Sequence, residues 1–179
     1  SSSWDSSTRK LSSLSKDVTS IEDKNKLTFL ESEFKKLLKK FNYSSKSLEY
    51  ISISSENYLP VAKKPNRDDL FYSIKFDSSA SDFVRSIWAY TCSLYKTSIS
   101  KNGNHPMLLM LDEPKQQDLA ISDFKIFLNE LSSYKEGQVL LFASFENSDE
   151  TFKNATENIE FKLNHIKDRL IMPIENKEN

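Results

Sequence analysis

The sequence predicts an α/β fold in which a parallel sheet is flanked by helices and preceded by a helical segment. Two apolar runs of strand length carry this prediction, residues 107–111 and residues 139–143. Continuous apolar runs are typical of strands that are covered on both faces, as in a parallel sheet. The segments beside these runs repeat their apolar residues at helical spacing. The resulting order is helix, strand, helix, strand.

The N-terminal segment repeats its apolar residues every three or four positions. The repeat comprises Leu11, Leu14, Val18 and Ile21, then Leu27, Leu30, Phe34, Leu37 and Phe41. This spacing is typical of a coiled-coil seam, and its slip at residues 22–25 indicates either a break between two helices or an irregular coiled coil. We expect residues 1–44 to form the end of a helical arm outside the core. A pair of amphipathic helices packed on a globular core explains the spacing equally well.

Short β-prone runs follow the helical segment, at residues 48–53, 58–59 and 71–76. Polar residues separate them, which predicts two or three short strands with an exposed loop at residues 63–69. Lys63, Lys64 and Arg67 form a small basic cluster in this loop. Such a cluster can contact a phosphate backbone, although a solvated loop is the more common interpretation.

Small hydroxyl residues precede the next helical pattern, residues 83–95, which is apolar nearly all round. Ser79 or Ser81 is well suited to cap this helix. A helix start exposes backbone N–H groups and the positive end of the helix dipole, so it can bind a phosphate. An ordinary capped, buried helix is the alternative.

Two adjacent carboxylates, Asp112 and Glu113, follow the first apolar run and precede Pro114. Ligands of parallel sheets bind outside the carboxyl ends of the strands. Neighbouring side chains on a strand point in opposite directions, so the two acids can take different roles. One can hold a hydrated Mg²⁺ and the other can polarise a water molecule. A strand that ends in a solvated acidic turn is the alternative.

The remaining elements complete the pattern. Residues 121–131 predict an amphipathic helix, residues 149–158 a polar helix and residues 169–174 a last strand. Residues 175–179 are expected to be a disordered tail.

The order and spacing of these elements resemble the C-terminal lobe of an ABC-type ATPase head of the SMC-like class. This class includes DNA-repair ATPases with long coiled coils and related bacterial defence proteins. The resemblance covers residues 48–174 and is most specific at residues 107–113, which resemble a Walker B motif. It implies that Asp112 is the magnesium-site aspartate and that Glu113 is the catalytic glutamate. It also implies nucleotide contacts from a diverged signature loop and a D-loop, at Ser79, Ala80, Ser81, Asp82, Gln116, Gln117 and Asp118.

The resemblance further implies a partial ATPase whose head lobe comprises residues 45–174. Such a lobe binds ATP and Mg²⁺ between two heads of a homodimer, and its expected partner is DNA, in repair or in phage defence. Ser79 would touch the γ-phosphate of the nucleotide on the opposite head. One alternative is a non-catalytic interaction module that keeps the fold without hydrolysis. Another is an unrelated α/β binding protein whose acidic turn is coincidental.

Two departures from the family pattern stand out. Where the family has a switch histidine, the chain has Ser144, Phe145 and Glu146, so the γ-phosphate sensor is either missing or supplied by another residue such as Ser144. The chain also has only 2 glycines, and neither belongs to a P-loop. We therefore expect the P-loop in an N-terminal lobe, on the same or a separate polypeptide, and expect this chain to be part of a longer or split protein.

Composition sets the outer limits. The 25 basic and 26 acidic residues nearly cancel, so charge does not indicate a class of partner. The single cysteine, Cys92, excludes an internal disulfide and fits a reducing cytoplasm. No apolar run approaches the roughly twenty residues of a membrane span, so no membrane partner is expected.

Overall fold

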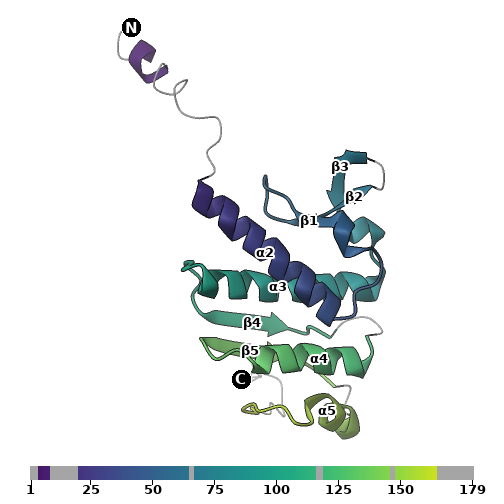
Figure 1. Cartoon of the computed structure of the whole chain (residues 1–179). Helices are drawn as coiled ribbons and strands as arrows, with labels where there is room; N and C mark the ends of the chain where they lie inside the picture. Colours follow the sequence, from purple (N-terminus) through teal and green to yellow (C-terminus); the bar gives the residue numbers. More distant parts are fainter. Residues whose placement is uncertain (1–3, 9–19, 65–66, 116–118, 146–147, 165–179) are drawn as a thin grey trace, which may run out of the picture.

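A computed structural model of the chain describes residues 4–8, 20–64, 67–115, 119–145 and 148–164 (Figure 1). It is a mixed helix and strand structure with a three-stranded antiparallel sheet and a two-stranded parallel sheet. The helices are α2 (Ile21–Lys40), α3 (Ala80–Ser100), α4 (Ile121–Ser132) and α5 (Asp149–Thr156). The strands are β1 (Ile51–Ile53), β2 (Pro60–Lys64), β3 (Arg67–Ser73), β4 (Leu108–Asp112) and β5 (Gln138–Phe142). The predicted mixture of helices and strands and the predicted parallel strand pair are confirmed.

Helix α2 begins at the point where the apolar seam slips. Ser20 caps it, because the Ser20 Oγ accepts a hydrogen bond from the Asp23 N–H at 3.0 Å and the Asp23 carboxylate accepts one from the Ser20 N–H at 3.1 Å. The second half of α2 is buried through Leu30, Phe34 and Leu37. This half therefore belongs to the core, whereas residues 1–44 were expected to form an arm outside it. The prediction failed here because the same apolar spacing is found in a coiled-coil seam and in a helix face that packs on a core. Residues 9–19 of the expected arm lie outside the described residues.

The antiparallel sheet corrects the loop predicted at residues 63–69. Strand β2 pairs with β1 on one side and with β3 on the other, and its pairing with β3 extends to Lys64 opposite Arg67. Lys63 and Lys64 therefore end β2, and Arg67 begins β3, instead of lying in an exposed loop. Strand β3 is an edge strand, where solvent on one side tolerates charged residues.

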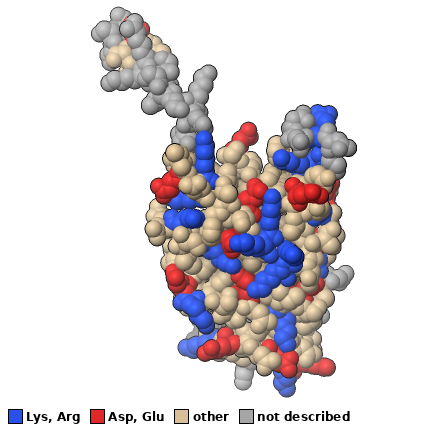
Figure 2. Space-filling view, in the orientation of Figure 1, with Lys and Arg blue, Asp and Glu red and all other residues tan. Residues whose placement is uncertain are grey.

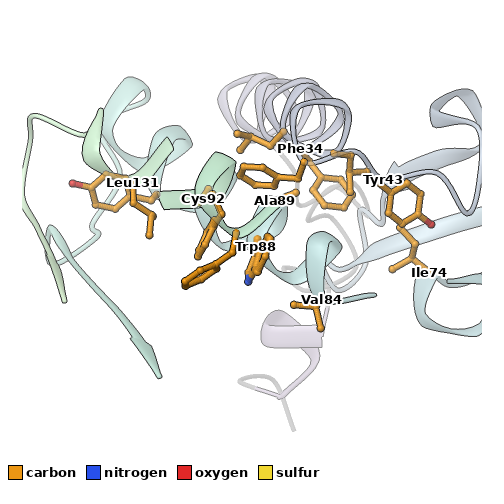
Figure 3. Packing of buried hydrophobic residues seen from close by; sticks show 14 of the residues in the cluster. Phe34, Tyr43, Ile74, Val84, Trp88, Ala89, Cys92 and Leu131 are labelled. Carbon is orange, nitrogen blue, oxygen red and sulfur yellow. The ribbon is translucent and has the colours of Figure 1, made fainter. Parts of the chain in front are cut away.

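Aromatic side chains from three helices form the centre of the core. Helix α3 lies between α2 and the β4–β5 sheet (Figure 1). Figure 3 shows Phe34 of α2 and Leu131 of α4 on either side of the α3 residues Trp88 and Cys92. The Trp88 ring stacks on the Phe127 ring with centroids 4.4 Å apart and an interplanar angle of 6°. The helices predicted over residues 83–95 and 121–131 are confirmed as α3 and α4.

The parallel sheet is covered on one face by the rest of the described chain. Leu109 is buried, and its partner Val139 packs against the same core. On the opposite face, Met110 is 60% exposed and Phe142 is 45% exposed. The expectation that this sheet is covered on both faces is therefore wrong for the described part of the chain, because no described element packs on that face.

Gly137 forms the turn that leads into β5. Its φ is +81°, and a Cβ added there would lie 2.3 Å from the Met107 carbonyl oxygen. Only glycine fits both constraints. The same carbonyl accepts a hydrogen bond from the Gln138 N–H at 2.7 Å, which starts the β4–β5 pairing.

Helix α5 confirms the polar helix predicted at residues 149–158. The strand predicted at residues 169–174 and the tail at residues 175–179 lie outside the described residues. Within the parts of the chain that the structure describes, none of the helices combines the length and apolarity needed to cross a bilayer.

Candidate functional site

The two predicted acidic residues lie at the carboxyl end of the parallel strand pair. Asp112 is the last residue of β4 and pairs in register with Phe142, the last residue of β5. Glu113 follows directly, and both acids are exposed. This edge of a parallel sheet is the place where ligands bind in open α/β folds.

Ser144 holds the Glu113 side chain. The Glu113 Oε2 accepts hydrogen bonds from the Ser144 backbone N–H and from the Ser144 Oγ, both at 3.1 Å. None of the hydrogen bonds among the described residues ends on the Glu113 Oε1. The carboxylate therefore has one oxygen fixed by two donors and another without a hydrogen bond to a described residue.

The backbone of Glu113 is strained. Its φ is +41°, in the left-handed region that costs a non-glycine residue about 1 kcal/mol or more. The Glu113 N–H donates to the Phe142 carbonyl at 2.8 Å, which ties the strained residue to β5. Strain of this kind persists only where surrounding contacts hold the backbone, and it is common at functional sites.

Trp88 anchors the acidic turn from the core side. The Trp88 Nε1–H donates to the Pro114 carbonyl oxygen at 2.9 Å, and this hydrogen bond is buried. Sequence reasoning did not identify this contact. The available signal was a tryptophan in a helix expected to be buried, because a buried indole N–H needs an acceptor.

Asp112 borders a shallow open hollow on the uncovered face of the sheet. Met110, Leu111 and Phe142 form its other walls. The described residues contain no group of three or more His, Cys, Asp or Glu side chains placed to share a metal ion. A hydrated Mg²⁺ does not need such a group, since it commonly binds through one or two carboxylates, water and phosphate oxygens. A single exposed Asp112 is compatible with that mode.

Phe145, which the resemblance places at the switch-histidine position, is a packing residue. Its ring lies 6.2 Å from the Phe124 ring and 5.3 Å from the Phe152 ring, measured between centroids. The polar group at the end of β5 is thus Ser144, whose hydroxyl already binds Glu113. Glu146 lies outside the described residues.

The serine-rich loop forms the start of α3. Ser79 is the N-cap, because its Oγ accepts a hydrogen bond from the Asp82 N–H at 3.1 Å. Ser79 and Ala80 are exposed, and Ser81 is half-buried with its Oγ 3.3 Å from the Ser79 Oγ. The loop thus presents Ser79 and Ala80 to the solvent, as a contact with another molecule requires.

Asp82 points into the protein. Its side chain is 2% exposed, and its Oδ2 accepts hydrogen bonds from the N–H groups of Ser44 and Ser45 at 3.1 and 2.7 Å. Burial alone would raise the pKa of Asp82, but hydrogen bonds from Ser45, Ser44 and Arg85 outweigh it and lower the pKa below its usual value. The carboxylate is therefore an ionised internal anchor for the loop.

Arg85 extends this anchor to α4. One guanidinium nitrogen binds Asp82 at 2.6 Å, and the other binds Asp123 at 2.6 Å. The Asn42 side chain also donates to Asp123, at 2.9 Å. The start of α3 and the first turn of α4 are therefore held by one buried ion network. Gln116, Gln117 and Asp118, the predicted D-loop contacts, lie outside the described residues.

The structure brings the acids together with Ser144 and keeps the serine loop separate from them. The N-terminal end of α3 and the carboxyl end of β4 lie on the same side of the molecule in Figure 1. No hydrogen bond among the described residues joins Ser79 to Asp112 or Glu113.

Comparison of the chain with models of known protein families and with curated proteins finds no match. The fold and the site define an α/β lobe with an acidic turn at the carboxyl end of a parallel strand pair.

Proposed function

We propose that this chain is the C-terminal lobe of an SMC-like ABC-type ATPase head, and that it supplies Asp112 and Glu113 to ATP bound between two heads. The acidic turn at the end of β4 carries the proposal. Glu113 there has a strained backbone and a carboxylate held by Ser144, the second residue after the neighbouring parallel strand. Together these contacts hold the Glu113 carboxylate in one orientation at the end of the strand.

The two acids would do different work in this proposal. Asp112 is an exposed carboxylate that would hold a hydrated Mg²⁺ through water. When bound, Mg²⁺ offsets the negative charge on the phosphate oxygens. Glu113, with Oε2 fixed by Ser144, would accept a hydrogen bond from the attacking water at Oε1 and take up its proton. Ser144 would keep the carboxylate oriented for that transfer.

The uncovered face of the parallel sheet supports a P-loop-bearing lobe as the partner. Two-stranded parallel sheets with one open apolar face are rare, because parallel sheets normally have both faces covered. Met110 and Phe142 on that face would be buried by a lobe that also extends the sheet. The chain has 2 glycines, neither in a P-loop, so the phosphate cradle must come from that lobe.

The second head and DNA complete the proposal. The exposed Ser79 and Ala80 would contact the nucleotide of the opposite head, with Ser81 and Asp82 shaping the loop. The resemblance is also the basis for proposing that the protein acts on DNA in the cytoplasm, in repair or in phage defence.

Charge gives this DNA partner no separate support. Figure 2 shows acidic and basic side chains intermixed over one face, with a basic group near its centre. Lysines of α2 pair with acids, as in the contacts of Lys36 with Glu33 at 2.6 Å and Lys40 with Glu130 at 2.5 Å. Paired lysines of this kind leave little net positive charge for a phosphate backbone.

Magnesium-dependent nucleotide binding tests the proposal. The affinity of the P-loop lobe for a fluorescent ATP analogue is measured with and without this chain, and with and without Mg²⁺. We expect the chain to increase the affinity only when Mg²⁺ is present, and we expect Asp112→Asn to remove most of that increase. Glu160→Gln, at an exposed acid outside the site, is the control and should behave like the wild type. An increase that persists without Mg²⁺ or in Asp112→Asn would contradict the role of Asp112.

A non-catalytic module that keeps this fold is the second candidate. The features that favour it are Phe145 in place of the switch histidine and the diverged signature loop at residues 78–82. Measured ATP turnover separates the two candidates, since a module without hydrolysis shows no turnover with any partner lobe.

A further inference from the structure

The loop that follows α2 is bound to the start of α3. The Ser45 Oγ donates a hydrogen bond to the Asp82 Oδ2 at 2.6 Å and accepts one from the Ser79 N–H at 3.0 Å. Close to this pair of bonds, the Tyr43 hydroxyl lies 2.9 Å from the Ser78 Oγ. One hydroxyl, that of Ser45, therefore connects the buried acid to the backbone of the N-cap residue.

The adjacent Ser44 makes a weaker version of the same contact. Its Oγ lies 3.3 Å from the Asp82 Oδ2, and the structure gives it no hydrogen bond to Ser79. Both serines are exposed residues, and both use their backbone N–H groups to bind Asp82, which a change of side chain would preserve. The two side chains therefore differ mainly in the link to Ser79.

We infer that Ser45 is a positioning residue for the Ser79 loop. Its hydroxyl fixes the backbone of Ser79 against the Asp82 carboxylate, and thereby sets where the Ser79 Oγ and the first N–H groups of α3 lie. Asp82 also binds Arg85, and Arg85 binds Asp123 in the first turn of α4. The Ser79 loop is therefore held in a fixed position relative to the start of α4 as well. This inference deepens the proposed function, since the loop matters for catalysis only if it contacts a nucleotide.

The network has a direct consequence for α2. Ser44 and Ser45 follow the C-terminal end of α2 at Lys40 by a few residues. A change in the direction of α2 would act on the Ser79 loop through Ser45. A loop fixed only by its own helix cap would be insensitive to α2.

Amide exchange in the 179-residue chain tests the positioning itself. The exchange rate of the Ser79 N–H, measured by NMR, should rise about two- to tenfold in Ser45→Ala, because that N–H loses its acceptor. It should stay unchanged in Ser44→Ala and return towards the wild-type rate in Ser45→Thr, which keeps a hydroxyl. Equal Ser79 exchange rates in wild type and Ser45→Ala would overturn the inference.

Head association in the complete ATPase tests what the positioning does. With the P-loop lobe present, Ser45→Ala should lower kcat and ATP-dependent association of heads while leaving KM for ATP nearly unchanged, and Ser45→Thr should restore both. A lower melting temperature with undiminished ATP-dependent association would show a merely structural role and overturn the inference. If the wild-type heads do not associate with ATP, the proposed function fails, and the amide exchange of Ser79 still decides whether Ser45 positions the loop.

Discussion

The Ser144 hydroxyl and backbone N–H both donate to one carboxylate oxygen of Glu113, each at 3.1 Å. These two hydrogen bonds link the acid after β4 to the second residue after the end of β5. It gives the strained Glu113 a defined orientation at an exposed edge of the sheet, where an unheld side chain would sample many rotamers.

Removing the Ser144 hydroxyl should weaken catalysis more than binding. In Ser144→Ala the backbone donor remains and one of two hydrogen bonds to Glu113 is lost, so we expect kcat to fall about tenfold with little change in KM. Ser144→Thr keeps the hydroxyl and should retain most of the rate. Steady-state ATP hydrolysis by the complete ATPase measures this, and a wild-type kcat in Ser144→Ala would contradict the orienting role of Ser144.

Ser79→Arg separates a nucleotide contact from a helix cap. A bulky cation on the exposed loop should abolish ATP-dependent association of heads, while ATP binding to a single head stays nearly unchanged. If Ser79 is only a cap, association persists and stability falls by about 1 kcal/mol. Light scattering with ATP under non-hydrolysing conditions, alongside a thermal melt, distinguishes the outcomes. Ser100→Arg, at the exposed opposite end of α3, is the control and should still associate.

Trp88→Phe should destabilise the acidic turn. The variant keeps the stack on Phe127 in part but leaves the buried Pro114 carbonyl without its donor, which costs about 1–3 kcal/mol in free energy of unfolding. Urea unfolding of the 179-residue chain measures the loss. Trp4→Phe changes an exposed tryptophan and should leave the unfolding midpoint unchanged. Equal midpoints for the two variants would show that the Pro114 contact contributes nothing to stability.

The lowered pKa of Asp82 predicts acid sensitivity of the fold. Ionised Asp82 stabilises the folded state fully when the pH is above 3.8, the usual pKa of the side chain. This contribution is lost as the pH falls from 3.8 through the lower pKa of Asp82 in the folded state. Burial would raise the pKa of Asp123, but its hydrogen bonds from Arg85 and Asn42 lower it. The contribution of Asp123 to stability is therefore also lost as the pH falls. The free energy of unfolding should therefore fall between about pH 5 and about pH 2, less steeply in Asp82→Asn than in the wild type. An equal slope in the two proteins would contradict the assignment.

Sequence reasoning located the elements where a local pattern is sufficient. The apolar runs at β4 and β5, the spacing of Phe124, Phe127 and Leu131 in α4, and the capping serine of α3 are each defined by neighbouring residues. The two acids were visible for the same reason, because Asp112 ends the strand and Glu113 directly follows it.

Contacts between distant segments were not visible in the sequence. The Ser45 hydroxyl meets Asp82 across 37 positions, and Trp88 meets Pro114 across 26. The periodicity of α2 could not tell a coiled-coil seam from a core-facing stripe, since both need apolar residues every three or four positions. Asp82 was expected to contact nucleotide because it lies in the serine loop, and only its burial shows that its carboxylate faces inwards.

Hydrolysis of ATP should be compared in three samples: the 179-residue chain alone, the chain with its P-loop lobe, and the Glu113→Gln chain with that lobe. We expect no turnover by the chain alone, since it has no phosphate cradle, and turnover when the lobe is added. We expect at least a hundredfold loss of kcat in Glu113→Gln with ATP binding preserved, because a group that orients the attacking water acts mainly in the transition state. Turnover by the chain alone, or an unchanged kcat in Glu113→Gln with the lobe present, would contradict the proposed role of this chain as a partial ATPase.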